Sequence, residues 1–159
     1  MVRQIRREGD ILKIKLKGGY VTYCRVLPEA SFAFYDARTR RRTVDIEWVL
    51  ERPILFIAPV YKQAVTMGRW ERVGRTPLEA HLQRLPPKFI QDSMYPSGFA
   101  IYEDAKIRHA TREECLGLEC FAVWDPEHLE ERIEDHYAGR RCKWLSDSEI
   151  EIMTGRKSD

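Results

Sequence analysis

The sequence lacks any apolar run of the roughly 18 residues that a membrane-spanning helix needs. The first ten residues carry five charged side chains and no apolar segment follows them, so no secretory signal is predicted there. Glycine and proline are sparse, at 9 and 8 of 159 residues, while 43% of residues are apolar and 33% charged. This composition excludes collagen-like, low-complexity and disordered chains. We expect a soluble, cytoplasmic protein with a packed core.

Cysteine is also scarce, and the four present are Cys24, Cys115, Cys120 and Cys142. Two disulfides are possible in principle, but a chain without an export signal is expected to keep reduced thiols. Cys115 and Cys120, with His136 and Cys142 further on, resemble a loose zinc-ligand spacing. The later pair has no short spacing and His136 falls within a predicted helix. We therefore expect buried thiols and no metal.

Complete catalytic motifs are absent: the sequence has no glycine-rich phosphate loop, no G-x-S-x-G and no H-E-x-x-H. Three partial sets remain: His128, Glu131 and Asp135; Glu103, Asp104 and Lys106; and Cys24 alone. Each has an ordinary structural interpretation, namely a solvated helix face, a strand end and core packing. The sequence therefore predicts a protein that is not an enzyme and needs no cofactor.

The first third of the sequence predicts antiparallel strands. Apolar and charged residues alternate over 11–17, and further strands are predicted over 20–27 and 31–36. Gly18-Gly19 has the spacing of a two-residue hairpin turn. The run 54–60 is the most apolar in the chain, which favours a central strand buried on both faces. Together these strands predict a bent antiparallel sheet with an SH3-like start.

The last third predicts a helix over 126–138. Asp125-Pro126-Glu127 is typical of a helix start, and Gly139 is placed to end the helix. Leu129, Ile133 and Tyr137 recur every four residues and are expected to face the core. Shorter elements are predicted as a helical turn at 62–67, strands at 70–73, 89–91 and 99–102, and a helix over 76–85 begun by Thr76-Pro77.

The expected fold class is therefore α+β and mostly β, with a bent antiparallel sheet and a packed C-terminal helix. No linker or internal repeat interrupts the chain, so one domain is predicted over residues 1–145. Residues 146–159 have a weak pattern and are expected to form a C-terminal extension with a frayed end.

Charge is unevenly distributed although the net charge is only +2. Residues 1–42 hold 11 basic and 4 acidic side chains, whereas residues 111–159 hold 7 basic and 13 acidic ones. Such a chain can steer a charged partner toward one end. The alternative is that folding mixes the two ends into a patchwork surface.

Ten short blocks, in order over residues 8–145, carry a resemblance to a known family. They are Gly9–Ile14, Gly19-Tyr20, Cys24–Leu27, Ala33–Asp36, Val60–Trp70, Pro77–Glu79, Phe89–Asp92, Cys115–Glu119, Ala122–His128 and Asp135–Arg140. With these blocks the chain resembles the immunity protein 26 family of bacterial polymorphic toxin systems, with Cys24 where a glycine is expected. The resemblance implies a mostly β protein that neutralises a cognate toxin by binding it, and it implies no catalytic residues.

Two surfaces are candidates for binding. A nuclease toxin would have a basic cleft, which an acidic inhibitor surface would complement. The densest acidic set is Glu127, Glu130, Glu131, Glu134 and Asp135. The alternative is a small nucleic-acid-binding module in the basic N-terminal third. It would use the basic turn, Arg38, Arg40, Arg41 and Arg42, beside the aromatic strand 31–36.

Overall fold

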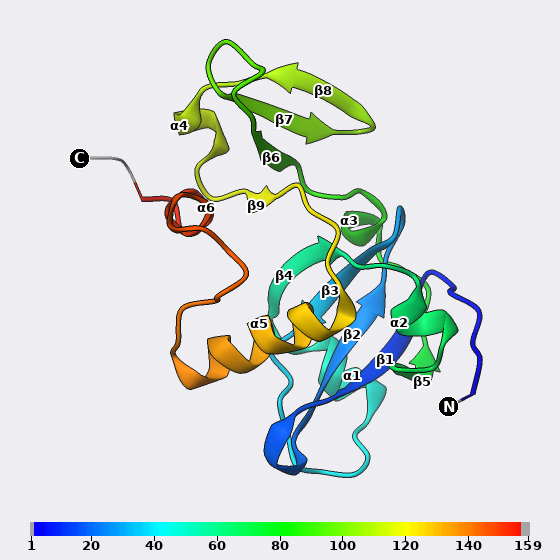
Figure 1. The fold of residues 1–159 in the computed structure, drawn as a ribbon. Helices are drawn as coiled ribbons and strands as arrows, with labels where there is room; N and C mark the ends of the chain where they lie inside the picture. Colours follow the sequence, from blue (N-terminus) through cyan, green and yellow to red (C-terminus); the bar gives the residue numbers. More distant parts are fainter. Residues whose placement is uncertain (1, 157–159) are drawn as a thin grey trace. The chain divides into compact units, whose positions relative to one another are not determined.

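The computed structural model describes residues 2–156, and Figure 1 shows its elements in chain order. The fold is α+β and mostly β, as predicted. Contacts group the chain into two compact units. The first contains residues 1–83 and 123–142, and the second contains residues 84–122 and 143–159. The domain boundary expected near residue 145 stays a prediction, and the expected fraying at residues 157–159 lies outside the described residues.

The first unit is built on an antiparallel sheet with the strand order β4-β3-β2-β1-β5. Its strands are β1 (Asp10–Lys15), β2 (Val21–Val26), β3 (Ser31–Tyr35), β4 (Ile54–Pro59) and β5 (Glu71–Arg75). The first four agree with the predicted strands to within two residues at each end. Short turns join β1 to β2 and β2 to β3, so this part of the sheet is a meander, as the sequence predicted.

Strands β2 and β3 are buried on both faces, and one of these faces carries Leu12, Cys24 and Phe34, which are neighbours across β1, β2 and β3. All three are at most 1% exposed. The buried indole of Trp70 meets Phe32 and Phe34 edge-on, with ring centroids 5.5 and 5.8 Å away. Edge-to-face aromatic packing of this kind stabilises a core beyond the area that it buries.

Two predictions about this sheet are wrong. The turn after β1 has three residues rather than two: it is a single 3-10 turn, Lys17–Gly19, closed by a 2.8 Å hydrogen bond from Leu16 N–H to the Tyr20 carbonyl. Gly18 and Gly19 adopt φ of 71° and 75°, which glycine accepts without strain. The other error concerns β4, which is an edge strand and not a central one.

Strand β4 is apolar throughout although it lies at the edge of the sheet. Ile54 is exposed and the next three residues are half-buried, so the strand is not covered on both faces. The guanidinium of Arg132 lies 3.6 Å from the centre of the Phe56 ring and covers it. Arginine packs well on aromatic faces, so a charged side chain can shield an apolar edge strand. An apolar run alone does not reveal which kind of group covers it.

Three short helices, α1 (Ile46–Leu50), α2 (Gln63–Thr66) and α3 (Ala80–Gln83), connect the strands. The helix predicted to begin at Thr76-Pro77 begins only at Ala80. Buried Arg25 donates hydrogen bonds of 3.0 and 2.7 Å to the carbonyls of Thr76 and Pro77, and one of 2.6 Å to the Glu79 carboxylate. These bonds engage two carbonyls that the first turn of a helix would otherwise use.

Helix α5 (Pro126–Ala138) lies across the sheet of the first unit (Figure 1) and has the predicted bounds. Leu129 and Ile133 are buried, and Tyr137 is half-buried. Gly139 ends the helix in the left-handed conformation at φ 68°. Asp125 occupies the position before the helix, but its side chain makes no capping hydrogen bond.

The second unit has a smaller sheet with the order β8-β7-β6-β9. Its strands are β6 (Lys88–Gln91), β7 (Phe99–Glu103), β8 (Lys106–His109) and β9 (Glu119–Cys120). Strand β9 is parallel to β6, and the other pairs are antiparallel. Helices α4 (Arg112–Cys115) and α6 (Asp147–Met153) complete this unit. None of the helices within residues 2–156 has the length and apolar character that crossing a bilayer would require.

Candidate functional site

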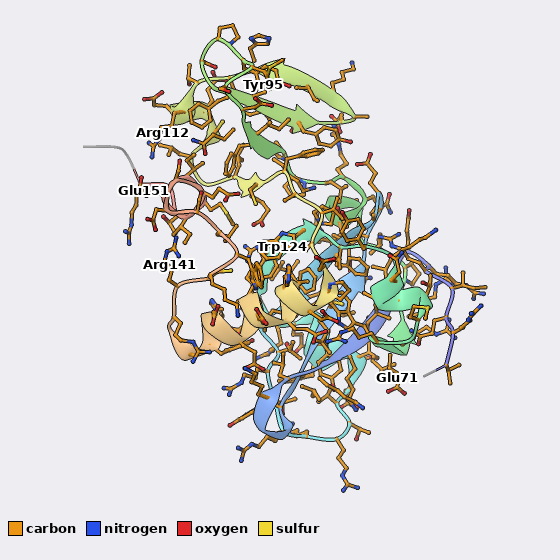
Figure 2. The ribbon with its side chains drawn as sticks, in the orientation of Figure 1. Glu71, Tyr95, Arg112, Trp124, Arg141 and Glu151 are labelled. Atoms are coloured by element: carbon orange, nitrogen blue, oxygen red, sulfur yellow. The ribbon has the colours of Figure 1, made fainter. Side chains whose placement is uncertain are left out.

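The predicted acidic set lies on α5, with all five carboxylates outside the buried stripe of Leu129 and Ile133. Figure 2 shows the side chains of this helix, with Trp124 labelled just before its first turn. The five acids differ in what they contact. Some hold the helix on the sheet of the first unit, and only Glu127 is exposed.

Glu130 is an internal anchor. Its carboxylate accepts hydrogen bonds of 2.7 and 2.8 Å from the Arg69 guanidinium and one of 2.9 Å from the Trp70 indole N–H. The side chain is only 17% exposed. The hydrogen bond to Glu130 also raises the pKa of Arg69. Because both carboxylate oxygens are engaged within the chain, Glu130 positions α5 and leaves little to offer a partner.

Glu134 and Asp135 also make contacts within the first unit. Glu134 accepts a 2.6 Å hydrogen bond from the backbone N–H of Lys17, which ties α5 to the turn after β1. Asp135 is 14% exposed and accepts a 3.1 Å hydrogen bond from Arg140, just beyond the helix end. The Glu134 carboxylate thus lies against the backbone N–H of Lys17, and the Arg140 guanidinium lies near the C-terminal end of the helix.

Glu127 and Glu131 complete the acidic set. The Glu127 side chain is 72% exposed, and its nearest cation is Arg69 at 3.6 Å. Glu131 is half-buried. Glu127, in the first turn of α5, is therefore the acid most accessible to a partner, and it also lies where the helix dipole favours a negative charge.

The basic turn meets this helix through Arg38, which the sequence did not reveal. The Arg38 guanidinium is 3.6 Å from the centre of the Tyr20 ring and 5.2 Å from that of Tyr137 on α5. Arg40 also covers Tyr20, at 4.4 Å. Burial, together with the hydrogen bond that Tyr137 donates to Asp36 at 2.8 Å, raises the pKa of Tyr137 to about 12. Tyr137 thus stays a neutral hydrogen-bond donor between the acidic and the basic regions.

The aromatic side chains expected to accompany the basic turn are not accessible. Phe32, Phe34 and Tyr35 are between 0 and 3% exposed and belong to the core. Tyr20 is covered by two guanidinium groups. Base stacking needs an exposed ring face, so this part of the chain offers charge without a stacking platform.

The residues considered for chemistry occupy structural positions. Glu103 and Lys106 pair across the β7–β8 turn, and Asp104 within that turn lies 3.5 Å from Arg84. Cys24 is fully buried, and burial raises the pKa of its thiol well above the usual value. A buried neutral thiol is a poor nucleophile.

The side chains that were considered as metal ligands do not converge. His128 lies 3.5 Å from Asp125, the residue before the helix. Cys115 and Cys120 are buried free thiols, and Cys142 is partly exposed. Within residues 2–156, no three histidine, cysteine, aspartate or glutamate side chains gather as a metal would require.

The chain is similar to a known protein family. A family model described as Immunity protein 26 matches residues 7–99, more than half of the chain. No curated protein and no solved structure matches. The matched region contains β1 to β6, and so the whole sheet of the first unit, but it ends before α5.

Proposed function

The chain belongs to the immunity protein 26 family, and from this premise we propose that it binds a cognate bacterial toxin and neutralises it without catalysis. The family match over residues 7–99 is the observation that carries this proposal. Inhibition by occupancy needs a rigid surface with complementary shape and charge, and no reactive group. A buried core and an ordered, charged helix face support that mode of action.

We propose the acidic face of α5 as the surface that covers the toxin. If the toxin is a nuclease, its cleft binds phosphates and is basic, so acids would complement it. Glu127 and Glu131 would face the toxin. Glu130, Glu134 and Asp135 would act indirectly, because their internal hydrogen bonds hold the helix in place.

Co-production with the toxin encoded by the neighbouring gene tests the function. Cells that make the toxin alone should stop growing, and cells that also make this protein should grow. The two purified proteins should form a stoichiometric complex. A toxin that remains active in a saturating excess of this protein would contradict the proposal.

Charge reversal tests the binding face. The double variant E127K/E131K should weaken toxin binding by about tenfold or more, since it places cations opposite a basic cleft. The control E47K/E51K changes charge equally, at exposed acids of the first unit on and just after α1. The control should bind within about twofold of wild type. An equal loss in both variants would show a long-range charge effect and would exclude α5 as the binding face.

The alternative of a nucleic-acid-binding module makes a different prediction. Binding to generic DNA and RNA would be strong at low salt, would fall steeply as salt rises, and would be lost in R41E/R42E. The buried strand aromatics argue against this alternative. Strong nucleic-acid binding by wild type, with no complex formed with the toxin, would replace the immunity function.

A further inference from the structure

The N-terminal segment, residues 2–7, alternates between side chains that anchor it and side chains that point to solvent. Gln4 and Arg6 are partly buried, whereas Arg3, Ile5 and Arg7 are exposed. This alternation is typical of an extended chain, in which successive side chains point to opposite sides. The segment thus presents two cations and an apolar side chain outward.

Gln4 fixes the segment against α2 and β5. Its side-chain amide donates hydrogen bonds to the carbonyls of Val65 and Trp70, at 3.0 and 2.7 Å. Its side-chain oxygen accepts a 2.8 Å bond from Arg72 N–H, and its backbone N–H donates to the Thr66 carbonyl at 3.2 Å. One side chain therefore satisfies three backbone groups, so this segment is held in a defined position.

Arg6 is the second anchor. Its guanidinium donates hydrogen bonds of 2.7 and 2.9 Å to the carbonyls of Leu27 and Ser31 and lies 5.1 Å from the centre of the Phe32 ring. Close packing continues at Gly68, where a side chain would collide with the carbonyl oxygen of Val2. The groove that this segment borders is thus formed before any partner binds.

The groove has a volume of about 580 Å³ and lies between the segment, Gly68 and β5. Its lining carries four cations, Arg3, Arg7, Lys15 and Arg72, against the single acid Glu71. Glu71, labelled in Figure 2, is the first residue of β5. The buried carboxylate of Asp10 lies 3.8 Å from the Arg72 guanidinium and helps to position it.

We propose that this groove binds an extended acidic segment of a partner protein. Arginine-rich grooves recognise carboxylates through charge-assisted hydrogen bonds. The walls also include Val2 and Ile5, which are 81% and 67% exposed and suit the apolar side chains of a peptide. None of the lining residues is aromatic, so the groove lacks the stacking surface that single-stranded nucleic acids use. This surface is separate from the acidic set on α5 and does not rest on the proposed function.

A peptide titration of the full chain tests the groove. The probe is a labelled peptide of alternating glutamate and valine, about eight residues long, which extends roughly 25 Å. The comparators are the same peptide with lysine in place of glutamate, and a labelled oligothymidine of eight nucleotides. The acidic peptide should bind, and its addition should shift the backbone amide resonances of Gln4, Gly68 and Arg72.

Matched variants show whether binding occurs at this place. R3E/K15E reverses two groove cations without touching Gln4, Arg6 or Arg72, and it should weaken binding of the acidic peptide by about tenfold or more. R41E/R42E makes the same charge change in the basic turn and should bind within about twofold of wild type.

Three results would overturn the proposal. They are no binding of the acidic peptide, equal weakening in both double variants, and tighter binding of the oligothymidine than of the peptide. The last would identify the groove as a phosphate-binding surface. None of these results depends on the toxin, so failure here leaves the proposed immunity function to its own test.

Discussion

At the scale of single residues, Glu130 links the candidate surface to the core, because it is the acceptor for the fully buried Trp70 indole. Glu130→Ala would leave that N–H without its partner, and we expect it to lower the free energy of unfolding by about 1–3 kcal/mol. Glu130→Gln keeps an acceptor and should lose less. Urea unfolding measures both, with Glu127→Ala as the exposed control. An equal loss for Glu130→Ala and Glu127→Ala would contradict the anchoring role.

Asp10 predicts a dependence of stability on pH. Its carboxylate is 1% exposed and has no hydrogen-bond partner, and burial raises its pKa despite the nearby guanidinium groups of Arg72, Arg75 and Arg7. The folded chain therefore holds this proton more tightly than the unfolded chain does. The stabilisation from protonation is complete below the unfolded pKa and is lost as the pH rises through the folded pKa.

Asp10→Asn tests this sign, because the amide does not titrate. Relative to the variant, the wild type should become less stable as the pH rises from about 4 to 7. Urea unfolding at several pH values measures the difference, and Glu8→Gln, an exposed neighbour, is the matched control. If the difference in the free energy of unfolding stays constant, or grows in favour of the wild type as the pH rises, the three arginines would outweigh burial in their effect on the pKa of Asp10.

At the scale of elements, α5 depends on its buried stripe. Ile133 is 1% exposed, so Ile133→Ala removes buried methyl groups and leaves a cavity. We expect a loss of about 2–5 kcal/mol in the free energy of unfolding, and about 0.5–1.5 kcal/mol for Ile133→Val. Thermal and urea unfolding measure both, with the exposed His136→Ala as the control on the same helix. A negligible effect of Ile133→Ala would mean that α5 does not pack on the sheet in solution.

Local patterns predicted the meander and α5, because alternation and helical spacing record which face of an element is buried. The second unit was predicted less well. Helices α4 and α6 each begin with a capping box, Thr111 with Glu114 and Ser146 with Glu149, and this spacing was present in the sequence. Strand β8 was missed because its turn places Asp104 and Ala105 at positive φ without a glycine.

The candidate surface could be predicted only in part. Which of its acids are accessible depends on contacts between residues far apart in the sequence. The sequence placed five acids on one helix. It did not indicate that Glu130 binds Trp70, or that Lys17 N–H donates to Glu134. For the same reason it did not reveal the groove at residues 2–7, which forms through hydrogen bonds of Gln4 to residues more than 60 positions away.

At the scale of the whole molecule, the question is whether the charge difference between the chain ends survives folding. In the first unit it is partly mixed: Arg38 of the basic turn contacts Tyr137 of the acidic helix, and the backbone N–H of Lys17 donates to Glu134. Two features still stand out, the exposed Glu127 at the start of α5 and the four-cation groove. Separate patches of opposite charge can bind different parts of one partner.

If the acidic face of α5 guides the toxin, its charge should act on the rate of encounter more than on the lifetime of the complex. Exposed charges at an interface change the association rate and its salt dependence, whereas buried pairs change dissociation. We expect the wild type to associate more slowly with a basic toxin as ionic strength rises, because salt screens the attraction between charges more than about 8–10 Å apart. E127K/E131K should associate more slowly and depend less on salt, whereas E47K/E51K should behave more like wild type. Stopped-flow or surface-plasmon measurements at several salt concentrations give both rates. Faster association at higher salt, or an effect confined to dissociation, would contradict steering by α5 and leave the binding face to be sought elsewhere on the molecule.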